Sequence, residues 1–458
     1  MTKSTAGRVA LIRPRYDGDD PEFQEPLGAE AICGYLREHG VDARVFDRML
    51  GVSCQDIEAY NPEWVGFSLM TSADAPDALR IRLILQQKNR RFFAGGLFVT
   101  TCPEQARALF PADTEMIAGE GEGPVLELVT TGKVQGKLMP GPDEWAYASR
   151  DQLREYLNRG GVINIRTSRG CKGACSFCTT PHSGMPSGHI TRSTEKIADE
   201  MLLISRNGYE PIFNFTDDMF GDHRRIEILE NALELRGLKA AFSLEMRAAE
   251  IAGTPRELWK KLHKGGLCRV FTGLESLDTQ TLAYWKKPVN TSKLISALDD
   301  MKNSGITCEV GYILWHNRTE PDKAEEEMRK LHEYDLLSPK TALSRLVLFP
   351  GSELYKEMKA DEICLCRLSP EAEQVYEKWE KLLYPLRQIW TAASCAIPRM
   401  CSEAFLDEEK VNAFRKLEKC IAYIKKMTWQ ALSTGMMPDE GKCRDIRGEL
   451  IALHIAGA

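Results

Sequence analysis

Three cysteines stand close together near the middle of the chain, at spacings that suit metal or redox chemistry. Cys171, Cys175 and Cys178 form a C-x3-C-x2-C segment, with Phe177 inside the last gap. Structural zinc sites usually close with four ligands, but the chain has no second C-x2-C pair and the nearest further ligand is His182. Iron–sulfur clusters also use thiolates, commonly four. Three local thiolates would leave one iron of such a cluster open for a substrate or cofactor. The alternatives to a cluster are a structural site and a chance grouping of cysteines.

The residues around this segment alternate between strand and helix patterns. Six apolar segments, separated by helical stretches, are candidate strands: 162–168, 211–218, 240–247, 268–276, 308–315 and 343–350. Six βα units predict a partial (β/α)6 barrel of the TIM type, whose chemistry lies at the carboxyl ends of the strands. Because the cysteines follow the first segment, we expect them at that end.

The first 130 residues show the same alternation, with glycines after several apolar segments. This pattern predicts a Rossmann-like, flavodoxin-like α/β domain that binds ligands in the loops beyond its strands. Residues 130–160 lack periodicity and suit a linker, and the pattern becomes helical near residue 370. We therefore expect four parts: 1–135 as the Rossmann-like domain, 136–160 as a linker, 161–365 as the partial barrel, and 366–458 as a helical region that caps the substrate site.

Length and charge narrow the class of protein. A chain of 458 residues is long enough for two or three domains. Its net charge of -6 gives no general reason to bind nucleic acid. No apolar run approaches the roughly 18 residues of a membrane span, and the four-residue run near the N-terminus is too short for a signal peptide. We expect a cytoplasmic protein without a membrane span, whose cysteines are free or metal-bound.

The cysteine segment T-S-R-G-C-K-G-A-C-S-F-C resembles the signature of radical S-adenosylmethionine (SAM) enzymes. Four later segments resemble other motifs of that barrel: 213–220, 242–247, 271–276 and 346–355. The resemblance implies that Cys171, Cys175 and Cys178 hold a [4Fe–4S] cluster whose open iron binds SAM. It also implies SAM-binding roles for residues near the strand ends: Phe177, Asp217, Asp218, Glu245, Arg247, Gly273, Glu275 and Ser276.

Four of these residues have simpler alternatives to SAM binding, and for two of the four the SAM-binding role also has a chemical reason. Glu275 suits the ribose hydroxyls as a charged acceptor, and Arg247 suits the methionine carboxylate. The alternatives are a solvated loop carboxylate for Glu275 and a surface ion pair for Arg247. Asp217 and Asp218 suit helix N-caps equally well.

The first domain resembles, over residues 8 to about 130, the cobalamin-binding domain found ahead of many radical SAM barrels. The resemblance implies that cobalamin contacts loops after the strands: Leu69, Met70, Thr71, Ser72, Gly95, Gly96, Gly119, Glu120 and Gly121. A nucleotide-binding or purely structural domain is the alternative. No histidine has an aspartate two positions before it, so the D-x-H-x-x-G motif is absent and we expect no histidine below the cobalt.

Together the two resemblances identify a cobalamin-dependent radical SAM enzyme of the class B methylase type. By that family's mechanism, one SAM methylates reduced cobalamin and a second yields a 5′-deoxyadenosyl radical. The radical activates an unreactive carbon, which takes the methyl group of methylcobalamin. We expect a methyltransferase that acts on a small metabolite or natural-product intermediate and takes electrons from a flavodoxin or ferredoxin.

Other functions are open as alternatives. They are a cobalamin-dependent rearrangement or cyclisation, a non-radical methylation, a methylthiotransferase-like modification, and a non-catalytic sensing scaffold. Trp315 and His316 replace the glycine-rich turn usual in related barrels. They predict either a substrate-specific wall or an ordinary exposed loop.

Overall fold

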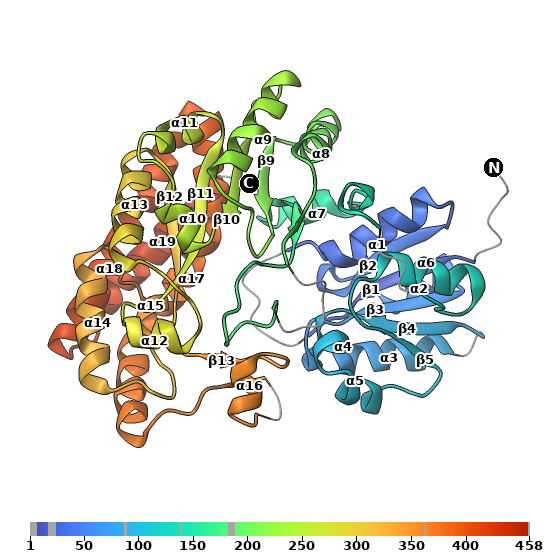
Figure 1. Ribbon diagram of the computed structural model, residues 1–458, viewed down its shortest axis with the longest axis horizontal. Coiled ribbons are helices and arrows are strands. Elements are labelled where there is room, and N and C mark those ends of the chain that lie inside the picture. The colour runs from blue at the N-terminus through green and yellow to red at the C-terminus, as the bar shows by residue number, and fades with distance from the viewer. Residues whose placement is uncertain are drawn as a thin grey trace.

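The computed structural model describes residues 7–16, 24–86, 89–136, 140–181, 188–360 and 363–456. His182, named above as the nearest further ligand to the cysteines, lies outside them. Figure 1 shows the N-terminal domain and the barrel side by side, with the C-terminal helices on the side of the barrel away from the N-terminal domain.

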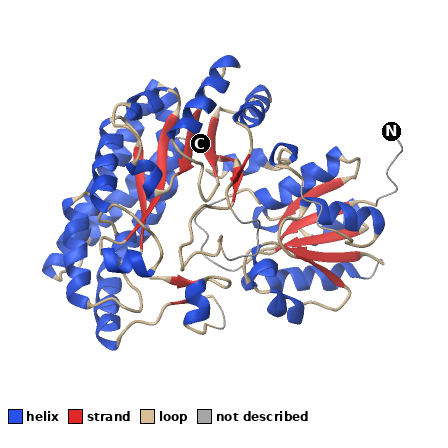
Figure 2. Ribbon diagram, viewed as in Figure 1, coloured by secondary structure: helices blue, strands red, loops and turns tan. Residues whose placement is uncertain are grey.

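The N-terminal domain is a parallel sheet between two layers of helices (Figure 2). Its strands are β1 (Val9–Arg13), β2 (Ala43–Asp47), β3 (Trp64–Ser68), β4 (Arg91–Gly95) and β5 (Thr114–Ile117). Its helices are α1 (Leu27–Glu38), α2 (Cys54–Tyr60), α3 (Ala75–Leu85), α4 (Leu97–Thr101), α5 (Pro103–Leu109) and α6 (Glu122–Thr131). The strand order β2-β1-β3-β4-β5 is the flavodoxin-like order, which confirms the predicted fold of this domain.

The sequence of β1 explains why this sheet is covered on both faces. Val9 and Leu11 belong to one apolar cluster, whereas Ala10 and Ile12 belong to another. Successive side chains of a strand point to opposite faces, so an uninterrupted apolar strand has to be covered by helices on both sides.

The barrel domain contains five parallel strands in chain order. They are β6 (Ile163–Ile165), β9 (Ile212–Phe215), β10 (Ala241–Glu245), β11 (Leu267–Glu275) and β12 (Thr307–Tyr312). The helices between and after them are α8 (Thr194–Arg206), α9 (His223–Leu235), α10 (Ala248–Ala252), α11 (Leu258–Lys264), α12 (Thr279–Tyr284), α13 (Thr291–Asn303), α14 (Pro321–Glu333) and α15 (Pro339–Ala342). This is the expected open βα barrel.

The sixth predicted strand does not extend the sheet as expected. Within the described residues, the segment after α15 meets the end of β12 through one parallel bridge, Trp315 to Arg345. It then forms β13 (Val347–Leu348), which pairs antiparallel with β14 (Cys364–Leu365), and α16 (Glu353–Glu357) lies between them. The chain leaves the barrel at this point to build a small β13–β14 ribbon.

The C-terminal region consists of α17 (Pro370–Leu406), α18 (Val411–Thr434) and α19 (Glu440–Ala456). Helix α17 contacts β9, β10 and β11. Near its C-terminal end, the Cys401 thiol lies 3.1 Å from the carbonyl oxygen of Cys268, at the start of β11. Helix α17 thus reaches the amino ends of the strands, whereas the cysteines were expected at the carboxyl ends. That the C-terminal region caps the substrate site stays a prediction.

Trp315 is neither a substrate wall nor part of an exposed loop. It is fully buried, and its indole nitrogen donates to the carbonyl of Ala342 at 2.8 Å. Its ring packs edge-on against Tyr376 and Trp379 of α17. The residue in place of the glycine-rich turn therefore anchors the C-terminal helices to the barrel, and His316 beside it is also buried.

The predicted linker includes a short helix, α7 (Leu153–Asn158), and a buried cation. The Arg150 guanidinium lies 3.1 Å from Glu25 of the first domain and 3.0 Å from Glu200 of the barrel. The two carboxylates balance the charge of the buried guanidinium, although its Nε has no hydrogen-bond partner among the described residues. Arg150 thereby ties the first domain to the barrel; the domain boundaries expected above stay predictions.

A buried carboxyl on α1 makes stability depend on pH. Glu30 is 1% exposed, and burial, with Glu25 nearby, raises its pKa to about 8. The folded chain therefore keeps a proton that the unfolded chain releases, so stability falls as pH rises from about 4.5 to 8. Glu30→Gln should stabilise the protein by about 1–3 kcal/mol at pH 8.5 and little at pH 5, as measured by urea unfolding.

Glu38, exposed on the same helix, provides the control for this prediction. Glu38→Gln should leave the pH dependence of stability unchanged. An equal effect of Glu30→Gln at both pH values would contradict the assigned pKa.

Candidate active site between the two sheets

The three cysteines lie on the loop between two short paired strands, β7 (Ser168–Arg169) and β8 (Ile190–Thr191). The backbone N–H of Gly173 donates to the Cys171 sulfur at 3.3 Å. A Cβ on Gly173 would lie 3.5 Å from that sulfur and 3.7 Å from the sulfur of Cys175. The loop therefore folds around its sulfurs, and Gly173 leaves free the space beside two of them.

Backbone hydrogen bonds and ring packing hold this loop on the barrel. The N–H of Ser176 donates to Trp285 O at 3.0 Å, and the N–H of Leu354 donates to Ser176 O at 2.9 Å. The Phe177 ring meets Trp285 edge-on with the centroids 5.6 Å apart. The loop is thus fixed by the end of α12 and by α16 before any cofactor binds.

The donor set of the loop fits an iron–sulfur cluster. The three cysteines are partly buried, and burial raises the pKa of the thiols of Cys175 and Cys178. In the described part of the chain, no three His, Cys, Asp or Glu side chains converge on a single ion position. A cluster places each thiolate on a different iron, so thiols that stand apart on one loop suit it, and the N–H bond to Cys171 is of the kind that tunes such clusters.

Glu275 and an unpredicted lysine form an ion pair next to the cysteine loop. Lys287 Nζ lies 2.7 Å from Glu275 Oε1, and both side chains are largely buried. A Cβ on Gly273 would overlap both groups. Glu275 itself has φ of 66°, a left-handed conformation that is costly for a residue with a side chain. The predicted Gly273–Glu275 motif therefore holds a largely buried ion pair, and Glu275 is not a carboxylate on a solvated loop.

Glu245 is the last residue of β10, and Arg247 follows two positions later. Burial, with Asp218 nearby, raises the pKa of Glu245 to about 7. Arg247 Nη2 would lie 3.8 Å from a Cβ on Gly173, so its guanidinium borders the cysteine loop. Its ion pair with Glu250 is long, at 3.9 Å. The Arg247 side chain is thus near the expected site and free to bind a carboxylate.

Asp217 and Ser276 are turned into the protein instead. Both carboxylate oxygens of Asp217 accept hydrogen bonds from Thr167 and Ser168, just ahead of the cysteine loop, and its pKa is raised by burial. The Ser276 hydroxyl bonds to Glu327 at 3.3 Å. These two residues shape the loops, and contact with SAM stays a prediction for them and for the other residues named above.

In the loops beyond β3, β4 and β5, some residues are exposed to solvent and others are held by contacts inside the domain. Met70 is 60% exposed and Ser72 is exposed, whereas Leu69 is fully buried and the Thr71 hydroxyl accepts from Ala73 N. Packing requires glycine at Gly96, where a Cβ would lie 2.4 Å from Leu69 O, whereas a Cβ on Gly95 would meet Ile117 O at 3.2 Å and one on Gly121 the flexible end of Ile32. Gly119 has φ of 81° with no atom near its Cβ position, so this loop has room for a ligand.

Two further observations fit a bound cobalamin. Glu120 is 8% exposed, and its Oε1 has no hydrogen-bond partner among the described residues, so it suits an amide N–H of the corrin side chains. The single histidine of residues 1–135 is His39, which follows the C-terminal end of α1 and thus lies at the edge opposite the strand carboxyl ends. The absence of a histidine ligand below the cobalt stays a prediction.

Arg169 joins these loops to the cysteine loop. Arg169 stands two residues before Cys171, and its guanidinium pairs with Glu120 and Glu122, which follow β5. All three side chains are at most 7% exposed. The guanidinium also lies over the Trp145 ring at 4.0 Å. The carboxyl end of the N-terminal sheet and the start of the cysteine loop are therefore in direct contact.

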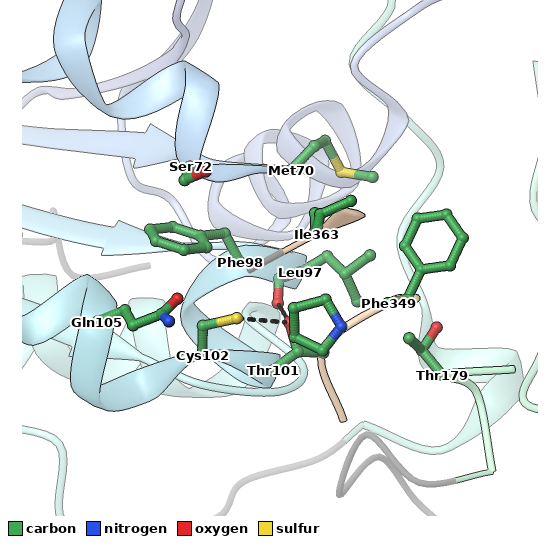
Figure 3. Close-up of a pocket in the computed structure, with 11 residues that line it drawn as sticks. Met70, Ser72, Leu97, Phe98, Thr101, Cys102, Gln105, Thr179, Phe349 and Ile363 are labelled. Carbon is green, nitrogen blue, oxygen red and sulfur yellow. Dashed lines mark hydrogen bonds between the residues drawn. The ribbon is translucent and has the colours of Figure 1, made fainter. Parts of the chain in front are cut away.

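A pocket lies between the N-terminal domain and the barrel beside this contact (Figure 3). Its lining comes from the β3 and β4 loops, the residue after Cys178, and the β13–β14 ribbon: Met70, Ser72, Leu97, Phe98, Thr101, Cys102, Gln105, Thr179, Phe349, Pro350 and Ile363. None of these side chains is charged. The pocket suits an uncharged, largely apolar group.

Sequence reasoning missed several residues of this site. Lys287, Arg169 and Glu122 act through contacts between distant segments, and no local motif identifies them, whereas Glu120 was among the expected cobalamin-binding residues. Phe349 lies in a segment that had been expected to continue the sheet, and its ring is 41% exposed at the pocket.

Comparisons with known proteins match both halves of this site. The B12 binding domain model matches residues 21–129, and the radical SAM superfamily model matches residues 165–331. The chain is 24% identical over 365 residues to hopanoid C-3 methylase of Methylococcus capsulatus, covering 72% of this chain and 68% of the relative. It is 23% identical to bacteriochlorophyllide d C-8(2)-methyltransferase of Chlorobaculum tepidum, and the match covers 70% of this chain and 71% of the relative.

A solved structure shares the overall arrangement. The cobalamin-dependent SAM radical enzyme OxsB, with aqua-cobalamin bound, superposes with a TM-score of 0.73 at 17% identity, covering 93% of this chain and 72% of that chain. At this identity the likeness shows the fold.

Proposed function

This chain belongs to the radical SAM enzymes that carry an N-terminal B12-binding domain, and from that premise we propose that it is a methyltransferase. It would methylate an unactivated carbon of its substrate, a small metabolite or natural-product intermediate. The two curated relatives described above, a methylase and a methyltransferase, support this proposal.

The cofactors follow from the two domains: a [4Fe–4S] cluster and SAM for the barrel, and cobalamin for the first domain. When bound, they supply a 5′-deoxyadenosyl radical and a transferable methyl group. We propose that Cys171, Cys175 and Cys178 hold the cluster and that the Glu275 carboxylate accepts from the ribose hydroxyls. Arg247 binds the carboxylate of SAM as a bidentate donor.

The observation that carries the proposal is the ion pair of Arg169 with Glu120 and Glu122. It places the loop that follows β5 of the cobalamin domain against the residue two positions before the first cysteine. A methyl donor on one sheet and a radical source on the other then face one shared site. A purely structural first domain has no need of this arrangement.

A second candidate function uses the same cofactors without methyl transfer. OxsB shares the fold of this chain, so the fold does not separate methylation from rearrangement or cyclisation. A putative methylthiotransferase of Methanocaldococcus jannaschii is 26% identical over 37% of this chain, a match that leaves most of the chain uncovered.

Two further assignments are part of this proposal. An external electron donor of the flavodoxin or ferredoxin type would reduce the cluster, and the enzyme would work in the cytoplasm. No helix among the described residues is long and apolar enough to cross a membrane.

Product analysis tests the proposed function. The protein is reconstituted anaerobically with iron, sulfide and cobalamin, reduced, and supplied with SAM and candidate substrates. S-adenosylhomocysteine together with 5′-deoxyadenosine, and a product heavier by one methyl group, supports methyl transfer. A converted substrate with an unchanged carbon count would support the rearrangement instead.

Replacing Gly273 with alanine should weaken SAM binding without unfolding the protein. The new Cβ would overlap the Glu275 carboxylate and the Lys287 ammonium, so the pair would have to move away from the ribose position. Losing one charge-assisted hydrogen bond costs about 1.5 kcal/mol, which raises the SAM dissociation constant about tenfold. Equilibrium binding of SAM to the reconstituted protein measures this dissociation constant.

Gly448→Ala is the control for this substitution, because no atom surrounds the Cβ position there on α19. It should leave SAM affinity unchanged. Equal affinity in Gly273→Ala and the wild type would show that SAM does not use the Glu275 carboxylate.

A further inference from the structure

Two neighbouring lysines at the end of α12 have different surroundings. Lys286 pairs with Glu353 at 2.5 Å on the surface, where the two side chains are 54% and 41% exposed. Lys287 pairs with Glu275 inside the site, where the side chains are 17% and 12% exposed. The left-handed backbone of Lys286, with φ of 54°, reverses the chain after the helix, and the two ammonium groups separate as a result.

Lys287 lies against the cysteine loop as well as against Glu275. Its ammonium is 5.7 Å from the centroid of the Phe177 ring. Lys287 follows Trp285 by two residues, and the carbonyl of Trp285 accepts from the N–H of Ser176, which lies between Cys175 and Cys178. The lysine therefore lies beside the cysteine loop, in a partly water-excluded region where charges are weakly screened.

The structure keeps Lys287 in this place at a cost. Glu275 adopts a strained left-handed conformation, and residue 273 has to be glycine because a Cβ there would overlap both members of the pair. A largely buried carboxylate needs a cationic partner, and Lys287 supplies it from a position beside the cysteine loop. The pair therefore puts a fixed positive charge next to that loop.

We propose that Lys287 is a positioning residue that fixes the Glu275 carboxylate and holds a positive charge beside the cluster, which makes the cluster easier to reduce. An added electron makes the cluster more negative, so a nearby fixed cation stabilises the reduced state and raises the reduction potential. The inference rests on the proposed cluster at Cys171, Cys175 and Cys178.

The test is a redox titration of the reconstituted cluster, followed by electron paramagnetic resonance, without cobalamin or substrate. Lys287→Met should move the midpoint potential to a more negative value. Lys287→Arg keeps the charge and should restore a value close to that of the wild type. Lys286→Met, which removes the neighbouring surface charge, should leave the potential unchanged.

The converse substitution protects the test against a misfolded variant. Glu275→Gln removes a negative charge from the same place, and it should move the midpoint potential to a more positive value. A potential that is the same in Lys287→Met and the wild type, or in Glu275→Gln and the wild type, would overturn the inference. Failure of the wild-type protein to bind iron and sulfide would instead refute the proposed cluster, so the two outcomes are distinct.

Discussion

Replacing Cys171, Cys175 and Cys178 with alanine will abolish the iron–sulfur absorbance and reduce SAM cleavage to background, while cobalamin binding remains. The thiols are the expected cluster ligands and lie together on one loop of the barrel. The cobalamin loops belong to another sheet with its own apolar clusters. Iron and sulfide content, ultraviolet–visible spectra and 5′-deoxyadenosine release measure the two properties separately.

Cys54, a partly buried cysteine at the start of α2 in the N-terminal domain, provides the matched control. Cys54→Ala should retain both the cluster and the cleavage of SAM. Full iron content in the triple variant would mean that other residues hold the metal, and the site described here would then be wrong.

Arg169→Ala will destabilise the protein more than any other single ion-pair substitution discussed here. It leaves the buried carboxylates of Glu120 and Glu122 without their cation, and such a loss typically costs about 3–5 kcal/mol. The loss should shrink as pH falls, because burial already raises the pKa of Glu120 and protonation removes the unpaired charge. Thermal or urea unfolding at pH 5 and pH 8 measures the effect.

Arg444 makes an exposed pair with Glu440 on α19, at 3.9 Å, and serves as the control. Because exposed ion pairs contribute about 0–1 kcal/mol, Arg444→Ala should have little effect on stability. Arg169→Ala should in addition weaken cobalamin binding, since it frees Glu120 to move. A variant as stable as the wild type would show that the two sheets are not joined through this residue.

The sequence predicted the architecture well because local patterns determine it. The uninterrupted apolar strands and the glycines after them indicate parallel sheets, and both sheets are parallel. Gly96 illustrates a limit of such motifs: it was expected at the cobalamin, yet its φ of 102° and the overlap of a Cβ with Leu69 O inside the domain are enough to require glycine. A glycine in a motif is consistent with a ligand and with plain packing alike.

Long-range contacts were beyond prediction from the sequence. Nothing near Lys287 in the sequence indicates that it meets Glu275, and nothing near Arg169 indicates Glu120 as its partner. Trp315 occupied a motif position and suggested a substrate wall, but it is a core residue that packs on α17. In each case the side chain's role depends on an element far away along the chain.

The transfer of a labelled methyl group tests the central claim most directly. The reconstituted, reduced enzyme with cobalamin would be given SAM carrying a trideuterated methyl group, together with candidate substrates rich in unactivated carbon. The account predicts 5′-deoxyadenosine, S-adenosylhomocysteine and a product that carries one deuterated methyl group, all lost in the triple cysteine variant. A substrate converted without the label, or a labelled product formed equally by that variant, would contradict it.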